Sequence, residues 1–407
     1  MTLFAALRLP GEILFGKGQR AALGRIAARL GTRVLVCTDS RMSADPVFRA
    51  MIADLEAHGL AVRIDDEVQP DVPRDSARAC AEKARSFAPD IVAGIGGGSC
   101  LDMAKCAALL LAHGGSPSDY YGEGKVPGPV LPVIAVPTTA GTGSEVTPVA
   151  VLSDPDRLLK VGISSPHLIP RSAICDPDLT MSCPASLTAI AGADALTHAI
   201  EAFMARTREP SAQLAQDHVF VGKSALTDHF AFLAIELLSR SLERACKDGS
   251  DEAARADVMM GALAAGCAFG TAGTAAAHAL QYPVGAVTHT AHGLGVATLL
   301  PFVMTFNRSA SLPELVRIAA AMGLSGDGQG PEKLAQRVIE RIDTIFAAIG
   351  IPGSLRELGL AEDRCDWTAE QALGIERLIK NNPRSIDLGA MKQLVRAAYD
   401  GDRRAVG

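Results

Sequence analysis

The sequence lacks the features that direct a chain to a membrane, to nucleic acid or out of the cell. No stretch of the 407 residues approaches the ~20 uninterrupted apolar residues that a membrane-spanning helix needs. Lys and Arg number 39 and Asp and Glu number 45, so a net charge of -6 leaves no overall basic surface. The N-terminal stretch MTLFAALRLPGEILFGKG has neither the positive start nor the cleavage site of a signal peptide. We therefore expect a cytoplasmic protein without a nucleic-acid or membrane partner.

Cysteine pairs with the spacing of structural zinc sites are also absent. The nine cysteines are scattered without any C-x-x-C pair, and most lie in apolar contexts such as VLVCTD and GCAFG. An odd number of cysteines without a repeated spacing is typical of reduced, packed thiols in a reducing compartment. A cysteine-rich zinc site is therefore not expected.

The hydrophobic share of 48% is enough for a large core, and the first half of the chain alternates strand-like and helix-like segments. Apolar β-branched runs predict strands, and longer segments with a helical period predict helices. The expected strands cover 33–39, 60–68, 90–99 and 132–139, and the expected helices cover 46–59, 74–88 and 101–113. This order favours a mostly parallel sheet with helices on both faces, in which ligands bind beyond the carboxyl ends of the strands.

The second half has a different character, because strand signals nearly vanish after about residue 186. Alanine-rich helices are expected at 186–205, 224–246, 251–270, 271–281, 293–305, 312–323, 330–349 and 387–399. Chains of this length usually form domains of about 100 to 200 residues. We predict an α/β domain over 1–184 and an all-helical domain over 185–407.

Two glycine-rich turns follow predicted strands of the first half. The segment GIGGGSCLDMAK (94–105) leads from a strand into a helix, and PTTAGTGSE (137–145) ends a second strand. Glycines at such a turn let backbone N–H groups approach an anion at the start of a helix. A single turn of this kind is as often purely structural, but two turns at one sheet edge would form a groove of dinucleotide size.

Asp39 ends the first clear strand, VLVCTD. A carboxylate at this position accepts hydrogen bonds from an adenosine ribose and repels the additional phosphate of NADP, which favours NAD. Taken alone, the residue is explained more simply as the N-cap of a turn that begins at Ser40. Both interpretations stay open on the sequence.

An acid and several histidines indicate a metal site in the second half. Asp194 and His198 lie four residues apart in the apolar helix LTAIAGADALTHAIEAF (187–203), so they share one helix face. By themselves they are also explained as an ordinary intrahelical pair. The segment 274–297 adds His278, His289 and His292. One carboxylate with two or three imidazoles suits Fe2+ or Zn2+ and leaves a position for a substrate oxygen.

These motifs together resemble the iron-containing (group III) alcohol dehydrogenase family over nearly the whole chain. The matching segments occur in the family's order: PGEILFGKG (10–18), GGGSCLDMAK (96–105), PTTAGTGSEVT (137–147), Asp176 to Leu179, GADALTHAIEAF (192–203), and His278 with His292 at the family's 14-residue interval. The resemblance implies a dehydroquinate synthase-like architecture, with a dinucleotide-binding α/β domain, a helical domain and a metal between them. It also implies a homodimer or larger homo-oligomer.

The resemblance assigns roles position by position. It implies that the metal ligands are Asp194, His198, His278 and His292. It implies a cofactor site made by Asp39, Gly97, Gly98, Ser99, Asp102, Thr138, Thr139, Thr142, Lys160 and Leu179. Fe2+ is the expected ion and Zn2+ the alternative, and NAD is expected in preference to NADP.

The chain departs from many family members at three places. Cys100 replaces a proline after the glycine turn, and Tyr282 stands where many members have a histidine that faces the substrate. The proton relay therefore has three candidates: Tyr282, His289 or the cofactor ribose. The segment 219–232 is also longer, and its Lys223 and His229 could contact an anionic substrate group. A capped helix start at Ser224 or Thr227 is the simpler interpretation of that segment.

The expected activity is the interconversion of an alcohol and its aldehyde or ketone by hydride transfer with NAD(H), assisted by a divalent metal. The partner is then a small alcohol or aldehyde. Two alternatives stay open: a dehydroquinate-synthase-like lyase that uses NAD and a metal without net oxidation, and a nucleotide-binding sensor without catalysis.

Overall fold

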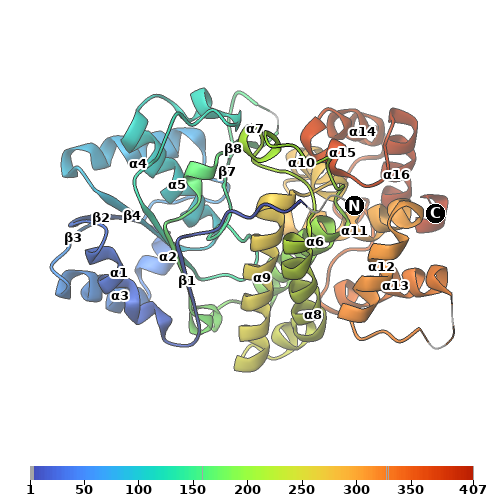
Figure 1. The fold of residues 1–407 in the computed structure, drawn as a ribbon, viewed down its shortest axis with the longest axis horizontal. Helices are drawn as coiled ribbons and strands as arrows, with labels where there is room; N and C mark the ends of the chain where they lie inside the picture. The colour runs from blue at the N-terminus through green and yellow to red at the C-terminus, as the bar shows by residue number, and fades with distance from the viewer. Residues whose placement is uncertain (1–3, 158, 327, 329, 407) are drawn as a thin grey trace.

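A six-stranded parallel sheet forms the centre of the N-terminal half (Figure 1). The computed structural model describes residues 4–157, 159–326, 328 and 330–406. Across the sheet the strands are β1 (Glu12–Phe15), β9 (Ser172–Cys175), β6 (Val133–Pro137), β4 (Ile91–Gly96), β2 (Arg33–Cys37) and β3 (Ala61–Asp65). The central strands β4, β6 and β9 are buried along their length, which explains their continuous apolar sequences.

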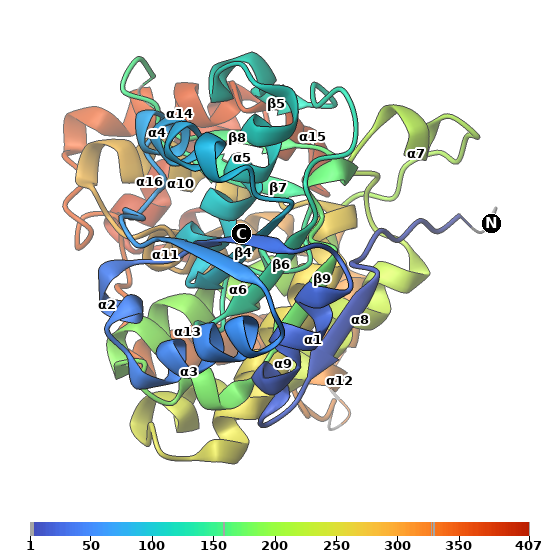
Figure 2. The ribbon, with the colours of Figure 1, turned by 90° about the vertical axis from the view of Figure 1, so that its left-hand side faces the viewer.

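Helices cover both faces of this sheet, as the alternating pattern predicts. Figure 2 shows α1 (Leu23–Ala28) and α3 (Pro46–Ala57) on one face, and α4 (Arg74–Ala84) and α5 (Gly98–His113) on the other. Neighbouring residues of β2 point to opposite sides, because Val34 packs with α1 and α3 whereas Leu35 packs with α4 and α5. The expected α/β class of the N-terminal half is thus confirmed.

Short strands are the elements that the sequence pattern did not reveal. The edge strand β1 and its neighbour β9 span four residues each. A second sheet is formed by β5 (Gly122–Glu123), β8 (Val161–Ser164) and β7 (Val149–Leu152). Segments this short contain too few alternating positions to separate a strand from a loop. The small α2 (Ser40–Ser43) was missed for the same reason.

The C-terminal half is helical, as expected. Its helices are α6 (Ala185–Met204), α7 (Leu214–Asp217), α8 (Ala225–Lys247), α9 (Glu252–Ala272), α10 (Ala276–Thr288), α11 (His292–Asn307), α12 (Leu312–Ala321), α13 (Pro331–Ala348), α14 (Cys365–Leu373), α15 (Glu376–Asn381) and α16 (Leu388–Asp400). The helix α6 packs against α8, α9 and α11, so it lies in the middle of this half. The last strand of the sheet ends at Cys175 and α6 begins at Ala185, and the domain boundary after residue 184 stays a prediction.

One expected helix, 271–281, has the wrong bounds. The helix α9 continues to Ala272 and ends at Gly273, whose φ of 82° is left-handed and favours glycine. A new helix, α10, then begins at Ala276 and runs to Thr288. Among the described residues no single helix is both long and apolar enough to cross a membrane, and α9 and α10 meet that test only as a pair bent by 100°.

Candidate active site

A cleft of about 650 Å³ lies between the carboxyl ends of the sheet strands and the helical half. Its lining includes most of the residues that the sequence singled out: Asp39, Gly97, Gly98, Ser99, Asp102, Thr139, Thr142, Lys160, Asp194, His198, His278, Tyr282 and His292. The loops after β2 and β4 border the cleft. These strands are neighbours, but after β2 the chain continues to β3 on one side, and after β4 it continues to β6 on the other side of the sheet. Ligands of open parallel sheets bind at such a crevice.

Four side chains from three helices converge on one side of the cleft. Asp194 and His198 come from α6, His278 from α10, and His292 is the first residue of α11. One ligand atom from each lies within 4.8 Å of the others. The Nε2 atoms of His198, His278 and His292 are 3.6, 3.8 and 3.9 Å from Oδ1 of Asp194. Ligands of a tetrahedral metal ion are separated by ~3.4 Å, so the cluster has the dimensions of a metal site.

The missing hydrogen bonds and the shifted pKa values of these side chains fit a divalent cation. Oδ1 of Asp194 and Nε2 of His278 are buried and have no hydrogen-bond partner among the described residues. Burial raises the pKa of Asp194 to about 7 and lowers the pKa of His198 and His292 well below the usual range. Neutral imidazoles keep a lone pair for a metal, and a carboxylate with three imidazoles suits Fe2+ or Zn2+.

A buried glutamate that the sequence reasoning overlooked orients one member of the cluster. Glu201 lies on α6 three residues after His198, and its Oε2 accepts a hydrogen bond from Nδ1 of His278 at 2.6 Å. Its carboxylate also accepts from the backbone N–H groups of Ala275 and Ala277, at 2.9 and 2.7 Å. With the proton held on Nδ1, the Nε2 lone pair of His278 points into the cluster. The positions 194, 198 and 201 share one helix face, which is the signal that could have revealed Glu201.

A close helix contact brings His292 to the cluster. A Cβ at Gly293 would lie 2.4 Å from the carbonyl oxygen of Ile190 and 3.0 Å from Cβ of Asp194. Only glycine therefore lets the start of α11 approach α6 this closely. Beside the cluster, the ring of His198 stacks on Phe269 with centroids 4.1 Å apart, and the Tyr282 ring is 6.2 Å from the His292 ring.

The glycine turn after β4 presents free backbone donors to the cleft. Gly97 is the N-cap of α5, and no side chain among the described residues caps this helix start. A Cβ at Gly98 would lie 2.5 Å from Cγ2 of Thr142, so glycine allows the two predicted turns to touch. An uncapped helix start with exposed N–H groups is a binding site for phosphate groups.

Asp39 caps a helix, as the simpler interpretation expects, and also lines the cleft, while its predicted contact with an adenosine ribose stays a prediction. It is the N-cap of α2, because its Oδ1 accepts from the N–H groups of Arg41 and Met42 at 3.0 and 2.9 Å. Its Oδ2 is 3.8 Å from Sγ of Cys100, and the residue lines the cleft. One carboxylate oxygen thus holds the turn while the other faces the cleft.

Some residues assigned to the cofactor site are held by other protein groups or lie elsewhere. The carboxylate of Asp102 accepts from Oγ of Ser144 at 2.6 Å and from the N–H of Val151 at 3.0 Å. Lys160 forms an ion pair with Asp71 at 2.6 Å. Thr138 and Leu179 are buried and do not line the cleft, because Thr138 bonds to Gly96 through its backbone and Leu179 packs in the sheet core.

The histidine and lysine suggested for the substrate side also lie outside the cleft lining. His289 is exposed at the left-handed end of α10 and lines a neighbouring cavity of about 270 Å³. Lys223 pairs with Glu314 at 3.0 Å and with Asp228 at 3.5 Å, and His229 is exposed. Ser224 caps α8, in agreement with the simpler interpretation of that segment.

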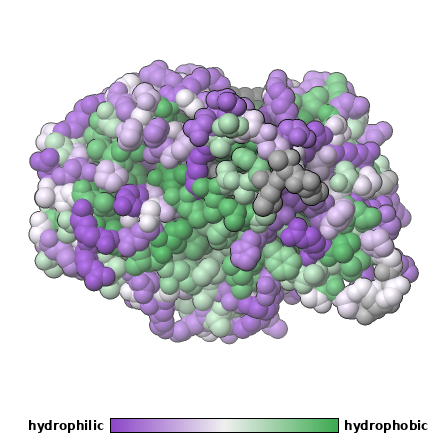
Figure 3. All heavy atoms as spheres, in the orientation of Figure 1, coloured by the Kyte–Doolittle hydropathy of each residue, from purple (hydrophilic) through white to green (hydrophobic). Residues whose placement is uncertain are grey.

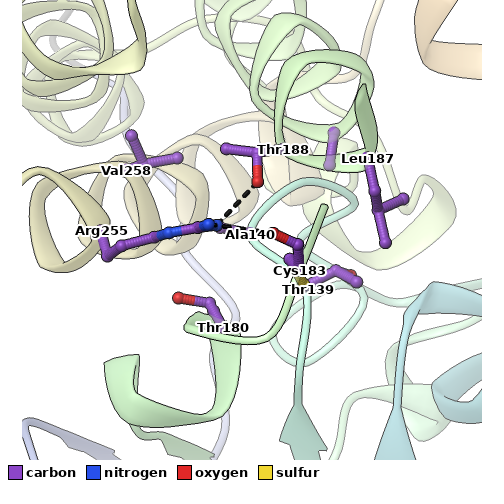
Figure 4. Close-up of a pocket in the computed structure, with 9 residues that line it drawn as sticks. Thr139, Ala140, Thr180, Cys183, Leu187, Thr188, Arg255 and Val258 are labelled. Carbon is purple, nitrogen blue, oxygen red and sulfur yellow. Dashed lines mark hydrogen bonds between the residues drawn. The ribbon is translucent and has the colours of Figure 1, made fainter. Parts of the chain in front are cut away.

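A small cavity beside the cleft contains a buried arginine that fixes the start of α6 (Figure 4). Arg255, on α9, donates to Oγ1 of Thr188 at 2.7 Å and to the carbonyl of Cys183 at 2.9 Å. It also donates to the carbonyl of Gly249 at 3.1 Å. Because Thr188 lies in the first turn of α6, Arg255 anchors the helix that carries Asp194 and His198.

Two family models match the chain and cover nearly all of it. The model described as iron-containing alcohol dehydrogenase matches residues 10–177, and its C-terminal counterpart, Fe-containing alcohol dehydrogenase family, C-terminal, matches residues 188–399. The chain belongs to the iron-containing alcohol dehydrogenase family. This membership confirms the resemblance read from the motifs.

Individual relatives in the family are similar over their full length. The long-chain-alcohol dehydrogenase 1 of Geobacillus thermodenitrificans is 36% identical, covering 92% of this chain and 91% of the relative. The NAD-dependent methanol dehydrogenase of Bacillus methanolicus is 31% identical, covering 96% and 98%. A crystal structure of 1,3-propanediol oxidoreductase superposes with a TM-score of 0.90 at 32% identity, covering 97% of this chain and 100% of that structure.

Family membership confirms the predicted class of activity, an alcohol dehydrogenase that uses NAD and a metal ion of the iron type. It favours the dehydrogenase over the lyase and the non-catalytic sensor that the sequence left as alternatives.

Proposed function

We propose that this chain interconverts a small alcohol and its carbonyl product at a metal held by Asp194, His198, His278 and His292, with Fe2+ as the ion and Zn2+ as the alternative. The observation that carries this proposal is the position of the cluster, whose buried Oδ1 and Nε2 atoms lack partners among the described residues. The same cleft contains the uncapped start of α5. The overall reaction is alcohol plus NAD+ giving the carbonyl compound, NADH and a proton.

The cofactor is held mainly by backbone groups at the sheet edge. The N–H groups at Gly98 and Ser99 bind the pyrophosphate, since nothing else among the described residues caps that helix start. The hydroxyl of Thr142, which touches Gly98, lies beside it. Asp39 binds the adenosine ribose through Oδ2 and disfavours the additional phosphate of NADP.

A bound divalent ion supplies the positive charge that lowers the pKa of the substrate hydroxyl, and NAD+ supplies the hydride acceptor. Tyr282 handles the released proton at its hydroxyl. It lines the cleft one helical turn after His278, and burial raises its pKa, so the phenol stays protonated at neutral pH. Its oxygen accepts the substrate proton as its own O–H proton passes to water in the neighbouring cavity, which Tyr282 also lines. His289 is the less suitable candidate because it is exposed and lies outside the cleft lining.

The ligand assignment is tested by His278→Ala, with His229→Ala as the matched control because His229 is exposed and remote from the cluster. Metal content after dialysis and NADH formation with a series of primary alcohols are measured for both variants. We expect His278→Ala to lose metal and activity and His229→Ala to keep both. Retention of metal and full activity in His278→Ala would overturn the ligand set.

The relay assignment has a separate test. Tyr282→Phe removes the hydroxyl and keeps the ring, so metal binding stays unchanged while turnover falls about 100-fold. His289→Ala serves as the comparison, and a loss in that variant instead of Tyr282→Phe would transfer the role to His289.

We also propose that two or more copies associate through the edge of the sheet at β1, and that the protein works in the cytoplasm. Figure 3 shows apolar surface gathered over β1 and α9. Leu9, Ile13 and Phe15 are only half-buried there, and β1 has a neighbour strand on one side only. Light scattering tests the oligomer, with Ile13→Lys expected to yield monomers.

The proposed cytoplasmic location is supported by the cysteines. All nine are free thiols, which suits a reducing compartment.

A further inference from the structure

Three cationic side chains line the cleft, and they differ in how their charge is balanced. Lys160 is paired with Asp71 at 2.6 Å, and Nε of Arg41 is 3.9 Å from Oδ1 of Asp39. Arg377, on α15, has no hydrogen bond or ion pair with any residue that the structure describes. Arg377 is half-buried, so its guanidinium faces the solvent of the cleft without a carboxylate or carbonyl that completes its hydrogen bonds. Among the residues that the structure describes, Arg377 is thus the cation of the cleft without a paired carboxylate.

Arg377 lies beside Phe220 and Tyr282 in the lining of the cleft, and these three residues are called the corner below. The guanidinium carbon lies 4.5 Å from the centroid of the Phe220 ring, which supports it from one side. Burial lowers the pKa of Arg377, yet an arginine stays protonated in proteins. The helix α15 packs on α10, which carries both His278 and Tyr282. This corner therefore belongs to the helical side of the cleft, where Tyr282 lies between Arg377 and the His292 ring, 6.2 Å from the latter.

Glu123, the one carboxylate among the described residues whose charge acts on Arg377, is already engaged in other hydrogen bonds. Glu123 influences Arg377 only through space, and it does not line the cleft. Its Oε1 accepts from the backbone N–H of Val219 and from that of Phe220 at 3.4 Å. These bonds fix the loop that presents Phe220. The carboxylate consequently positions the wall of the corner and leaves the guanidinium fork free for a ligand.

We infer that the substrate of this dehydrogenase carries an anionic group, such as a carboxylate, which Arg377 binds while the hydroxyl or carbonyl end lies at the Asp194 and histidine cluster. The inference rests on the proposed function of that cluster. The planar fork of an arginine binds a carboxylate through two hydrogen bonds, which fixes the orientation of a short chain between the two ends. Lys223 and His229, which the sequence suggested for this purpose, lie outside the cleft lining.

The kinetic test compares substrates of equal carbon number in which a carboxylate replaces the terminal methyl group. The acids are glycolate, 3-hydroxypropanoate and 4-hydroxybutanoate, and the neutral controls are ethanol, 1-propanol and 1-butanol. We expect the metal-loaded enzyme to have a higher kcat/KM for at least one acid than for the matching alcohol. Arg377→Met should lower kcat/KM for that acid by about 10- to 100-fold and leave the alcohols within about 3-fold. Arg377→Lys should give an intermediate value for the acid.

Two controls separate this inference from its alternatives. Arg364→Met removes an exposed arginine that stacks on Trp367 outside the cleft, and it should leave every substrate unchanged. Calorimetric titration with butanoate and butanamide then measures binding without turnover. We expect butanoate to bind the metal-loaded enzyme more tightly than butanamide, and Arg377→Met to remove the difference.

Equal losses for acids and alcohols in Arg377→Met, or a raised KM for NAD+ alone, would overturn the inference, since Arg377 would then support the fold or the cofactor. Activity with alcohols but with no acid would also overturn it and would leave the proposed function standing. A lack of activity with every alcohol and acid would instead contradict the proposed function itself.

Discussion

The two sides of the cleft differ in how their polar side chains are satisfied. On the side of the sheet, Asp102 bonds to Ser144 and Val151, Lys160 pairs with Asp71, and one oxygen of Asp39 caps α2. On the helical side, Oδ1 of Asp194 and Nε2 of His278 are buried without a hydrogen-bond partner among the described residues. The half-buried guanidinium of Arg377 forms no hydrogen bond or ion pair with those residues either. Both sides line one continuous cavity.

This difference indicates how each side recognises its ligand. The sheet side offers backbone N–H groups at a helix start to its ligand, so its side chains are available to form the hydrogen bonds that hold the turns. The helical side uses the side chains themselves, and a buried polar atom without a partner is costly unless a ligand completes it. Unpartnered atoms therefore mark the metal and substrate positions but would not reveal the dinucleotide position.

The largest effect is expected for Asp194→Asn, which tests whether the two sides of the cleft bind their ligands independently. This substitution keeps the shape of the side chain and removes its charge. A carboxylate is one of four ligands in the cluster, so we expect the affinity for Fe2+ or Zn2+ to fall about a thousandfold. The affinity for NAD+, measured by fluorescence titration of the metal-free protein, should change less than about 3-fold. Equal losses of metal and NAD+ affinity would show that the two sides are not independent.

A second variant tests Glu145, a buried carboxyl group on the sheet side of the cleft. Glu145 is buried in the second glycine-rich turn near Lys105, and burial raises the pKa of its carboxyl from 4.5 to about 7. The stability associated with its protonated form is fully present below pH 4.5 and is lost as the pH rises through 7. Glu145→Gln is neutral throughout, so relative to the wild type it should gain about 3 kcal/mol between pH 4.5 and 8.

Thermal unfolding of the metal-free proteins at pH 5 and pH 8 measures this gain, because metal binding then contributes nothing. The melting temperature of Glu145→Gln should exceed that of the wild type at pH 8 by more than it does at pH 5. A difference that is the same at both values would mean that Glu145 does not titrate differently on folding.

The helical side can be weakened indirectly through Glu201, which touches His278 but no position expected for the metal. In Glu201→Gln the amide cannot accept all three N–H bonds that the carboxylate accepts, so His278 loses its fixed orientation. We expect the metal affinity to fall about 10- to 100-fold, with Thr197→Val on the same helix as the control. Addition of excess Fe2+ should restore most of the activity, which a misfolded variant would not recover.

The sequence predicted the long helices and the metal cluster well because both leave strong local patterns. The segment carrying Asp194 and His198 was expected over 186–205 and forms Ala185–Met204, since its apolar period and the preceding proline define it. The spacing of His278 and His292 could be recognised without any knowledge of packing. In contrast, Arg377 lies in a six-residue helix, and nothing local distinguishes it from a surface arginine.

The residues that could not be predicted depend on contacts between distant segments. Glu201 gains its role only when Ala275, Ala277 and His278 approach it from another helix. Thr138 and Leu179 were assigned to the cofactor by position in the family's motifs; both are buried and neither lines the cleft, and their assignment stays a prediction. Motifs identify segments reliably, but which side chain of a segment faces the ligand is decided by packing.

The smallest expected effect concerns the choice of cofactor at the sheet side. In Asp39→Gly the Oδ2 carboxylate atom that faces the cleft is removed, and Arg41 at the neighbouring helix start is released from its 3.9 Å contact. Loss of the negative charge and the free guanidinium both favour the additional phosphate of NADP, so the ratio of kcat/KM for NADP+ to that for NAD+ should rise about 10-fold. Glycine also removes the N-cap of α2, at a cost of a few tenths of a kcal/mol, so Asp39→Asn serves as the variant that keeps the cap. If Asp39→Asn shifts the ratio as much as Asp39→Gly, the negative charge of Asp39 discriminates between the two cofactors. If only Asp39→Gly shifts it, the effect is steric. The sheet side would then select its cofactor by shape and backbone donors alone.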